Sequence, residues 1–94
     1  MVTYPVQVPR KSYRGSDQRR LLKVITHNRV AAELERYING RIQSRAEETQ
    51  TFLYYEIAAE TGCPKDLVRD VLFGVDGGHN GLTVRKPAGA VGRA

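Results

Sequence analysis

The stretch that decides the fold is IAAETGCPKDLVRDVL, from Ile57 to Leu72. An apolar helical turn reaches Gly62, and a glycine can adopt the positive φ that ends a helix. Pro64 suits the first turn of a new helix, where its missing amide hydrogen would have no partner. Beyond it, apolar residues recur at helical spacing: Leu67, Val68, Val71 and Leu72. The stretch predicts two short helices, Tyr54–Thr61 and residues 64–73, packed across a tight turn.

The next residues, FGVDGGHNGLTVRK from Phe73 to Lys86, predict a β-hairpin. Apolar residues for its two short strands are Phe73, Val75, Leu82 and Val84. Glycine and asparagine between the strands favour a turn because they tolerate positive φ. The segment GGHNG is not a phosphate-binding P-loop, since it lacks the terminal lysine and serine or threonine and leads to a strand.

The spacing of four residues resembles the helix-turn-helix of bacterial transcriptional regulators. In that pattern a small residue is followed by a glycine four positions later, and branched apolar residues lie six and nine positions beyond the glycine. These positions hold Ala58, Gly62, Val68 and Val71. The added hairpin is similar to that of the winged-helix branch. The resemblance implies a mainly α fold with a small β-hairpin, a winged helix-turn-helix.

A long helical signal precedes this unit, from Asp17 to Gln43. Ser16 or Asp17 can cap its start, and apolar residues then recur at intervals of three and four: Val30, Ala31, Leu34, Tyr37, Ile38 and Ile42. The sequence leaves open whether this is one helix or two that meet near Asn28, and Gly40 favours fraying after Asn39. The cluster Leu21–Ile25 exceeds what a minimal winged helix needs, so it either extends the core or makes a dimer contact. We expect a homodimer through the Leu21–Ile42 region.

Between these helices, two interpretations of Ser44–Glu47 stay open. The S-x-x-E pattern is typical of a capping box at a helix start, whereas the poor helix formers that follow favour a polar loop. Thr51 or Phe52 is expected in the very short strand that winged helices place before their second helix.

The flanks differ in composition from the middle of the chain. We predict a flexible basic arm over residues 1–16, the winged helix-turn-helix domain over 17–86 and a flexible tail over 87–94. Residues Val2 to Pro9 alternate apolar and other residues, which suits an edge strand that pairs with a partner. A disordered terminus is the alternative, and it is the favoured interpretation.

The net charge of +5 is unevenly distributed. The first fifty residues carry the whole excess, and the remaining residues are neutral. A basic arm suits a phosphate backbone, although a solvated face that keeps a small protein in solution is the alternative. We expect double-stranded DNA as the partner.

The resemblance implies that helix 64–73 enters the major groove. Its outward residues are Lys65, Asp66, Arg69 and Asp70. Arg69 is the expected base reader, since a guanidinium pairs bidentately with guanine. The two aspartates must bind cytosine amino groups, orient Arg69 or point away. In the wing, residues 74–86, His79 and Asn80 are expected near the minor groove, with Arg85 and Lys86 on phosphates. Further phosphate contacts are expected from the arm: Arg10, Lys11, Arg14, Arg19 and Arg20.

Other function classes receive little support. His27, His79 and Cys63 are too few and too scattered for a zinc site, and no catalytic serine, histidine and acid pattern is visible. We therefore expect no enzyme activity, cofactor, metal or small-molecule substrate. A single cysteine, with no signal peptide or apolar membrane span, favours the cytoplasm. The alternative function is a winged-helix module that binds only protein.

Overall fold

The longest element of the computed structural model, which describes residues 2–75 and 77–86, is helix α1 (Gln18–Ser44). Asp17 caps its N-terminus, as predicted, because its carboxylate accepts hydrogen bonds from the backbone N–H groups of Arg19 and Arg20. The helix runs without a break through Asn28 and Gly40, which settles the open question in favour of one helix. Fraying after Asn39 is not observed, since Ile42 is still buried in the core.

Three strands form one small sheet in the order β1-β3-β2: β1 (Val2–Thr3), β2 (Thr49–Leu53) and β3 (Gly81–Arg85). The central strand β3 runs parallel to β1 and antiparallel to β2, with Phe52 opposite Leu82. The strand predicted near Thr51 and Phe52 is therefore confirmed and longer than expected. Residues 45–48 form a loop between α1 and β2, so the capping-box interpretation of Ser44–Glu47 is wrong.

The predicted hairpin of residues 73–86 is also wrong. Phe73 is the last residue of helix α3 (Lys65–Phe73), and the chain folds back onto the helix end instead of entering a strand. The N–H groups of Val75 and Gly77 both donate to the carbonyl of Leu72, at 3.0 and 3.1 Å. Strand β3 already has β1 on one side and β2 on the other, so it has no free edge for the strand that was predicted to begin at Phe73.

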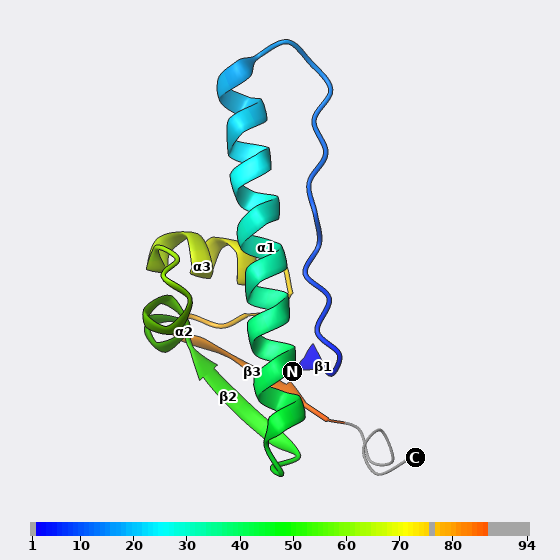
Figure 1. Ribbon diagram of the computed structural model, residues 1–94, viewed down its shortest axis with the longest axis vertical. Coiled ribbons are helices and arrows are strands. Elements are labelled where there is room, and N and C mark those ends of the chain that lie inside the picture. The colour runs from blue at the N-terminus through cyan, green and yellow to red at the C-terminus, as the bar shows by residue number, and fades with distance from the viewer. Residues whose placement is uncertain (1, 76, 87–94) are drawn as a thin grey trace.

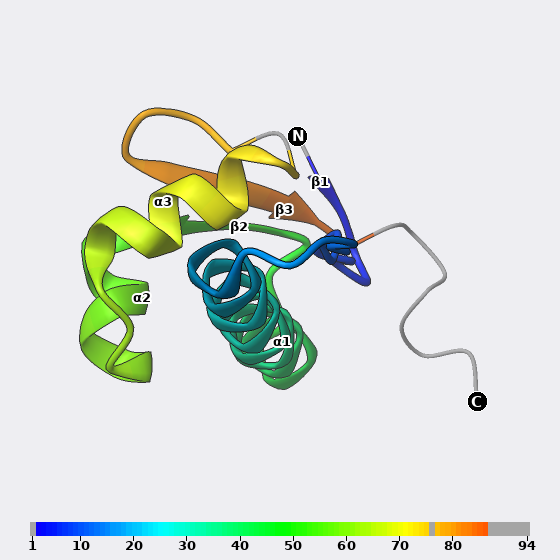
Figure 2. The same ribbon diagram turned by 90° about the horizontal axis from the view of Figure 1, so that it is seen from above.

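The two short helices and the turn between them agree with the prediction. Helix α2 (Tyr54–Thr61) has the predicted bounds, and Gly62 follows it with φ 76°. Helix α3 begins at Lys65, directly after Pro64, so its start is one position later than predicted. The turn between the two helices, the start of α3 and the middle of α1 line a shared recess. Figure 2 shows α2 and α3 beside α1.

The N-terminal segment lies along α1 instead of standing free (Figure 1). Val6 and Val8 are buried in the core, and β1 pairs with β3. The Asn39 side chain of α1 holds the backbone of the N-terminal segment at Val6. Its Oδ1 accepts from Val6 N–H at 2.8 Å, and its Nδ2 donates to Val6 O at 2.9 Å. This differs from the predicted flexible arm, because the apolar alternation buries alternate valines. The predicted tail, residues 87–94, lies outside the described residues.

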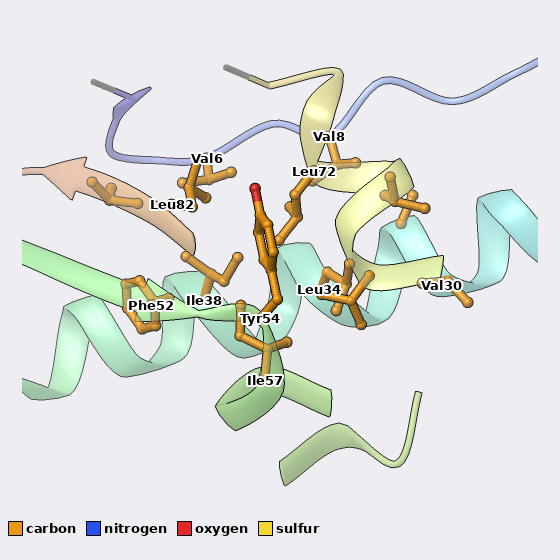
Figure 3. Packing of buried hydrophobic residues seen from close by; sticks show 14 of the residues in the cluster. Val6, Val8, Val30, Leu34, Ile38, Phe52, Tyr54, Ile57, Leu72 and Leu82 are labelled. Atoms are coloured by element: carbon orange, nitrogen blue, oxygen red, sulfur yellow. The ribbon is translucent and has the colours of Figure 1, made fainter. Parts of the chain in front are cut away.

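The core joins all of these elements in one cluster, with Tyr54 at its centre (Figure 3). The ring of Tyr54 stands among Leu34, Ile38 and Leu72, and its side chain is fully buried. Its hydroxyl donates to the carbonyl of Gly78 at 2.7 Å. This bond ties the connection between α3 and β3 to the start of α2. The core thereby fixes both the outward face of α3 and the loop that follows it.

Candidate nucleic-acid interface

Residues 10–29, which we call the finger, carry most of the positive charge. They comprise the end of the N-terminal segment and the first turns of α1, which project beyond α3 in Figure 1. Their charged side chains are seven basic residues and one acid: Arg10, Lys11, Arg14, Arg19, Arg20, Lys23, Arg29 and Asp17. The net charge of the finger is thus +6, whereas residues 30–86 together carry −2. The protein has a strongly positive end and a mildly negative body.

Most of the finger's cations are exposed to solvent. Two of them form ion pairs: Arg10 Nη1 lies 3.3 Å from Glu35 Oε2, and Arg20 Nε lies 3.8 Å from Asp17 Oδ2. Such exposed pairs are worth at most about 1 kcal/mol each and compete poorly with a polyanion. The finger can therefore present its charge to phosphate groups.

The outward face of α3 presents the four predicted residues together. Val68, Val71 and Leu72 are buried, so the opposite side of the helix is exposed: Lys65, Asp66, Arg69 and Asp70. The guanidinium of Arg69 lies between the two carboxylates, with Nη2 3.8 Å from Asp66 Oδ1 and Nε 3.8 Å from Asp70 Oδ1. Of the three roles considered for the aspartates, this geometry fits the orientation of Arg69.

A recess joins the finger to α3. It is lined by residues of both elements: Lys11, Leu22, Lys23, Thr26, His27, Leu67 and Asp70. Lys11 and Lys23 therefore lie on the same concave surface as Asp70 of α3. The two candidate binding regions, the finger and the exposed face of α3, are neighbours on one side of the molecule.

His79 and Asn80 are exposed on the connection between α3 and β3. The carbonyl of Asn80 accepts a hydrogen bond from Tyr54 N–H at 2.9 Å, and the Tyr54 hydroxyl binds Gly78. Burial raises the pKa of Tyr54, while the positive charge of Arg69 acts in the opposite direction. His79 and Asn80 thus lie on an anchored loop and not at the tip of a β-wing.

Arg85 and Lys86 lie away from the finger. Lys86 is buried, and its Nζ donates to the carbonyl of Arg45 at 3.0 Å, directly after the C-terminus of α1. Arg19 lies at the opposite end of that helix, about 40 Å away at 1.5 Å per residue. Arg85 is exposed and lies 3.5 Å from Glu48. Lys86 therefore has a structural role, which differs from the predicted phosphate contact.

Sequence reasoning missed two cations of the finger, Lys23 and Arg29, and the groups that hold the N-terminal segment. Helical periodicity was the available signal for the cations, because neither occupies a position of the buried stripe of α1. The holding groups lie at intervals of seven and four residues on α1: Asn28, Glu35 and Asn39. That spacing follows one side of a helix, and polar residues there had no evident partner in the sequence.

No protein-family model, curated protein or solved structure matches the chain. Within residues 2–75 and 77–86, no three histidine, cysteine or acidic side chains gather closely enough to hold a metal ion. No helix in that part of the chain is long and apolar enough to cross a bilayer.

Proposed function

We propose that this chain is a small sequence-specific protein that binds double-stranded DNA and regulates transcription. The observation that carries the proposal is the juxtaposition of the +6 finger with the exposed face of α3. In this proposal α3 enters the major groove, and the finger contacts the adjacent phosphates. A single cysteine in the chain fits action in the reducing cytoplasm.

The order of elements supports a winged-helix arrangement. A helix, a short strand, the two helices of the helix-turn-helix and a further strand follow one another, and β2 pairs with β3. The departure lies in the connection to β3, which is a loop anchored by Tyr54 in place of a hairpin wing. His79 and Asn80 remain exposed on that loop for a sugar or base-edge contact.

Affinity and specificity have separate sources in this proposal. The exposed cations of the finger supply phosphate contacts, which are independent of sequence and weaken with salt. Arg69 supplies base readout, worth about 1 to 3 kcal/mol of discrimination at one base pair. Asp66 and Asp70 oppose phosphate by charge, so α3 adds selectivity and little general affinity.

The test is binding to a labelled random duplex, measured by fluorescence anisotropy over a series of salt concentrations. Four to six phosphate contacts give a slope of log affinity against log salt of about −4 to −5. The variant Arg19→Gln/Lys23→Gln should reduce that slope by about 2. A matched control, Arg36→Gln/Arg41→Gln, removes the same charge from the other half of α1 and should change the slope little. No binding at low salt would refute the proposal.

Selection of bound sequences from a random duplex pool tests the reading residue. Arg69→Ala should relax the preferred base at one position and leave binding to random DNA almost unchanged. The finger variant Arg19→Gln/Lys23→Gln should weaken every site alike. Equal behaviour of the two variants would exclude a reading role for Arg69.

The second candidate, a module that binds only protein, is favoured by two exposed aromatic side chains on the helix-turn-helix. Tyr55 on α2 is 59% exposed and Phe73 at the end of α3 is 56% exposed. Aromatic residues are enriched in protein–protein interfaces, whereas duplex DNA makes little use of them on a recognition helix. Absence of duplex binding, with Tyr55 and Phe73 required for capture of a protein partner, would support this candidate.

A further inference from the structure

Two adjoining recesses between α1 and the start of α3 form one surface, which we call the groove. They have volumes of about 350 and 360 Å³ and share Thr26 and Leu67 in their linings. Their other apolar lining residues come from α1 and from the turn before α3: Leu22, Val30, Cys63 and Pro64. Leu22 is 60% exposed, so an apolar wall of the groove faces solvent. Phosphate groups are anions that gain nothing from apolar walls, so the groove needs a separate explanation.

The groove also carries positive charge that has no carboxylate partner. Within residues 2–75 and 77–86, three cations of the finger line the groove and form no ion pair: Lys11, Lys23 and Arg29. The two acids of the lining are already paired. Asp70 Oδ1 lies 3.8 Å from Arg69 Nε, and Glu33 pairs with Arg36. The charge that the groove can offer to a ligand is therefore positive.

This combination of apolar walls and unpaired cations restricts the occupant. A second copy of the chain would bring its own finger, of net charge +6, against the same cations. Duplex DNA can offer phosphates to the rim but has no side chains to fill the walls. The lining of α1 extends from Leu22 to Glu33, about 16 Å, which matches three turns of another helix. An amphipathic helix places its apolar residues in such a groove at intervals of three and four.

We infer that the groove binds an acidic amphipathic helix of another protein and that this helix displaces DNA. Its apolar side chains lie against Leu22 and Leu67, and its carboxylates pair with the three unpaired cations. Lys11 and Lys23 are also among the cations that contact phosphates in the proposed function, so the helix and duplex DNA exclude one another. That exclusion rests on the proposed function, whereas binding of the helix does not.

Selection of random displayed peptides on the full chain tests the chemistry of the occupant. The peptides have about 12 residues, enough for three helical turns. Enriched peptides should combine two or more carboxylates with large apolar residues spaced three or four positions apart. Enrichment of apolar peptides without acids, of basic peptides, or of none would overturn the inference.

Fluorescence anisotropy of one labelled peptide from this selection tests the contacts. Lys23→Glu and Leu22→Gln should each raise its dissociation constant at least tenfold, about the effect of losing one interface hot spot. Arg41→Glu is the matched control, because it makes the same kind of charge reversal on α1 about 27 Å from Lys23. It should change the constant less than about threefold, since salt screens charges at that distance. Equal losses for Arg41→Glu and Lys23→Glu would overturn the inference, and circular dichroism should show unchanged helix content in all three variants.

Competition with a labelled random duplex separates this inference from the proposed function. The unlabelled peptide should displace the duplex. Lys23→Glu should weaken both ligands, whereas Leu22→Gln should weaken only the peptide, because phosphates do not use the apolar wall. Equal loss of duplex and peptide binding in Leu22→Gln would show that DNA fills the groove, and simultaneous binding of both ligands would overturn their exclusion. A chain that binds the peptide but no duplex would contradict only the proposed function.

Discussion

The attachment of the N-terminal segment to α1 gives the sharpest test of the structure, through Asn39→Ala. The Asn39 amide donates to the carbonyl of Val6 and accepts from its N–H, at 2.9 and 2.8 Å. Val6 is buried, so water cannot easily replace either bond. Each bond contributes about 1 kcal/mol net, and alanine regains about 0.5 kcal/mol as the better helix former. The expected loss is therefore about 1.5 kcal/mol of unfolding free energy.

Asn28→Ala is the matched control. Asn28 makes the same pair of hydrogen bonds to Lys11, both at 2.8 Å, but at an exposed position where water can replace them. Its expected cost is below about 0.5 kcal/mol. Urea unfolding followed by circular dichroism measures both variants, and Asn39→Ala should lower the midpoint by about 1 M or more with an unchanged slope. Equal midpoints for the two variants would refute the packing of Val6 beneath Asn39.

Two further predictions concern the helix and the sheet. Gly40→Ala should stabilise the protein by about 1 kcal/mol, because a Cβ there meets no atom within 4 Å and alanine favours the helix. Gly81→Ala should destabilise the protein by about 1 to 3 kcal/mol, since the new Cβ would collide with the carbonyl of Phe52 on β2. Thermal unfolding should show a raised midpoint for Gly40→Ala and a lowered midpoint for Gly81→Ala, and shifts of the same sign would contradict the two predictions. Tyr54→Phe should cost about 1 kcal/mol at pH 7 by loss of the bond to Gly78. Because burial raises the pKa of Tyr54 above its ordinary 10.0, the stability that its neutral hydroxyl contributes is full below pH 10 and is lost as the pH rises through the raised value. Urea unfolding from pH 8 to 11 should therefore show a steeper decline for the wild type than for Tyr54→Phe, and parallel curves would contradict the burial of this hydroxyl.

The elements that the sequence predicted well are those whose signals are local. Gly62 and Pro64 mark the turn between α2 and α3 within three residues, and the helical spacing of Val68 and Val71 identifies the buried side of α3. The exposure of Arg69 follows from the same spacing. Neighbouring residues alone determine these features, so one sequence suffices to find them.

The elements that differed from expectation depend on residues far apart in the chain. Val6 is held by Asn39, and β3 lies between two strands from distant parts of the sequence. Lys86 is buried beside the C-terminal end of α1, where its Nζ donates to the carbonyl of Arg45. For the candidate site, composition indicated the positive charge of the finger, but only the fold shows that Lys23 shares a surface with α3.

The place of β3 in the sheet has a consequence for how the protein is made. Strands β1 and β2 pair only with β3 in this sheet, yet β3 follows every other described helix and strand along the chain. The Val2 to Val84 pairing spans almost the whole sequence, and such distant contacts slow folding. During synthesis, the helices can form while the first strand has no partner to join. The sheet can therefore form only after residues 81–85 have been made. A chain interrupted before them should keep its helical content but lack the sheet.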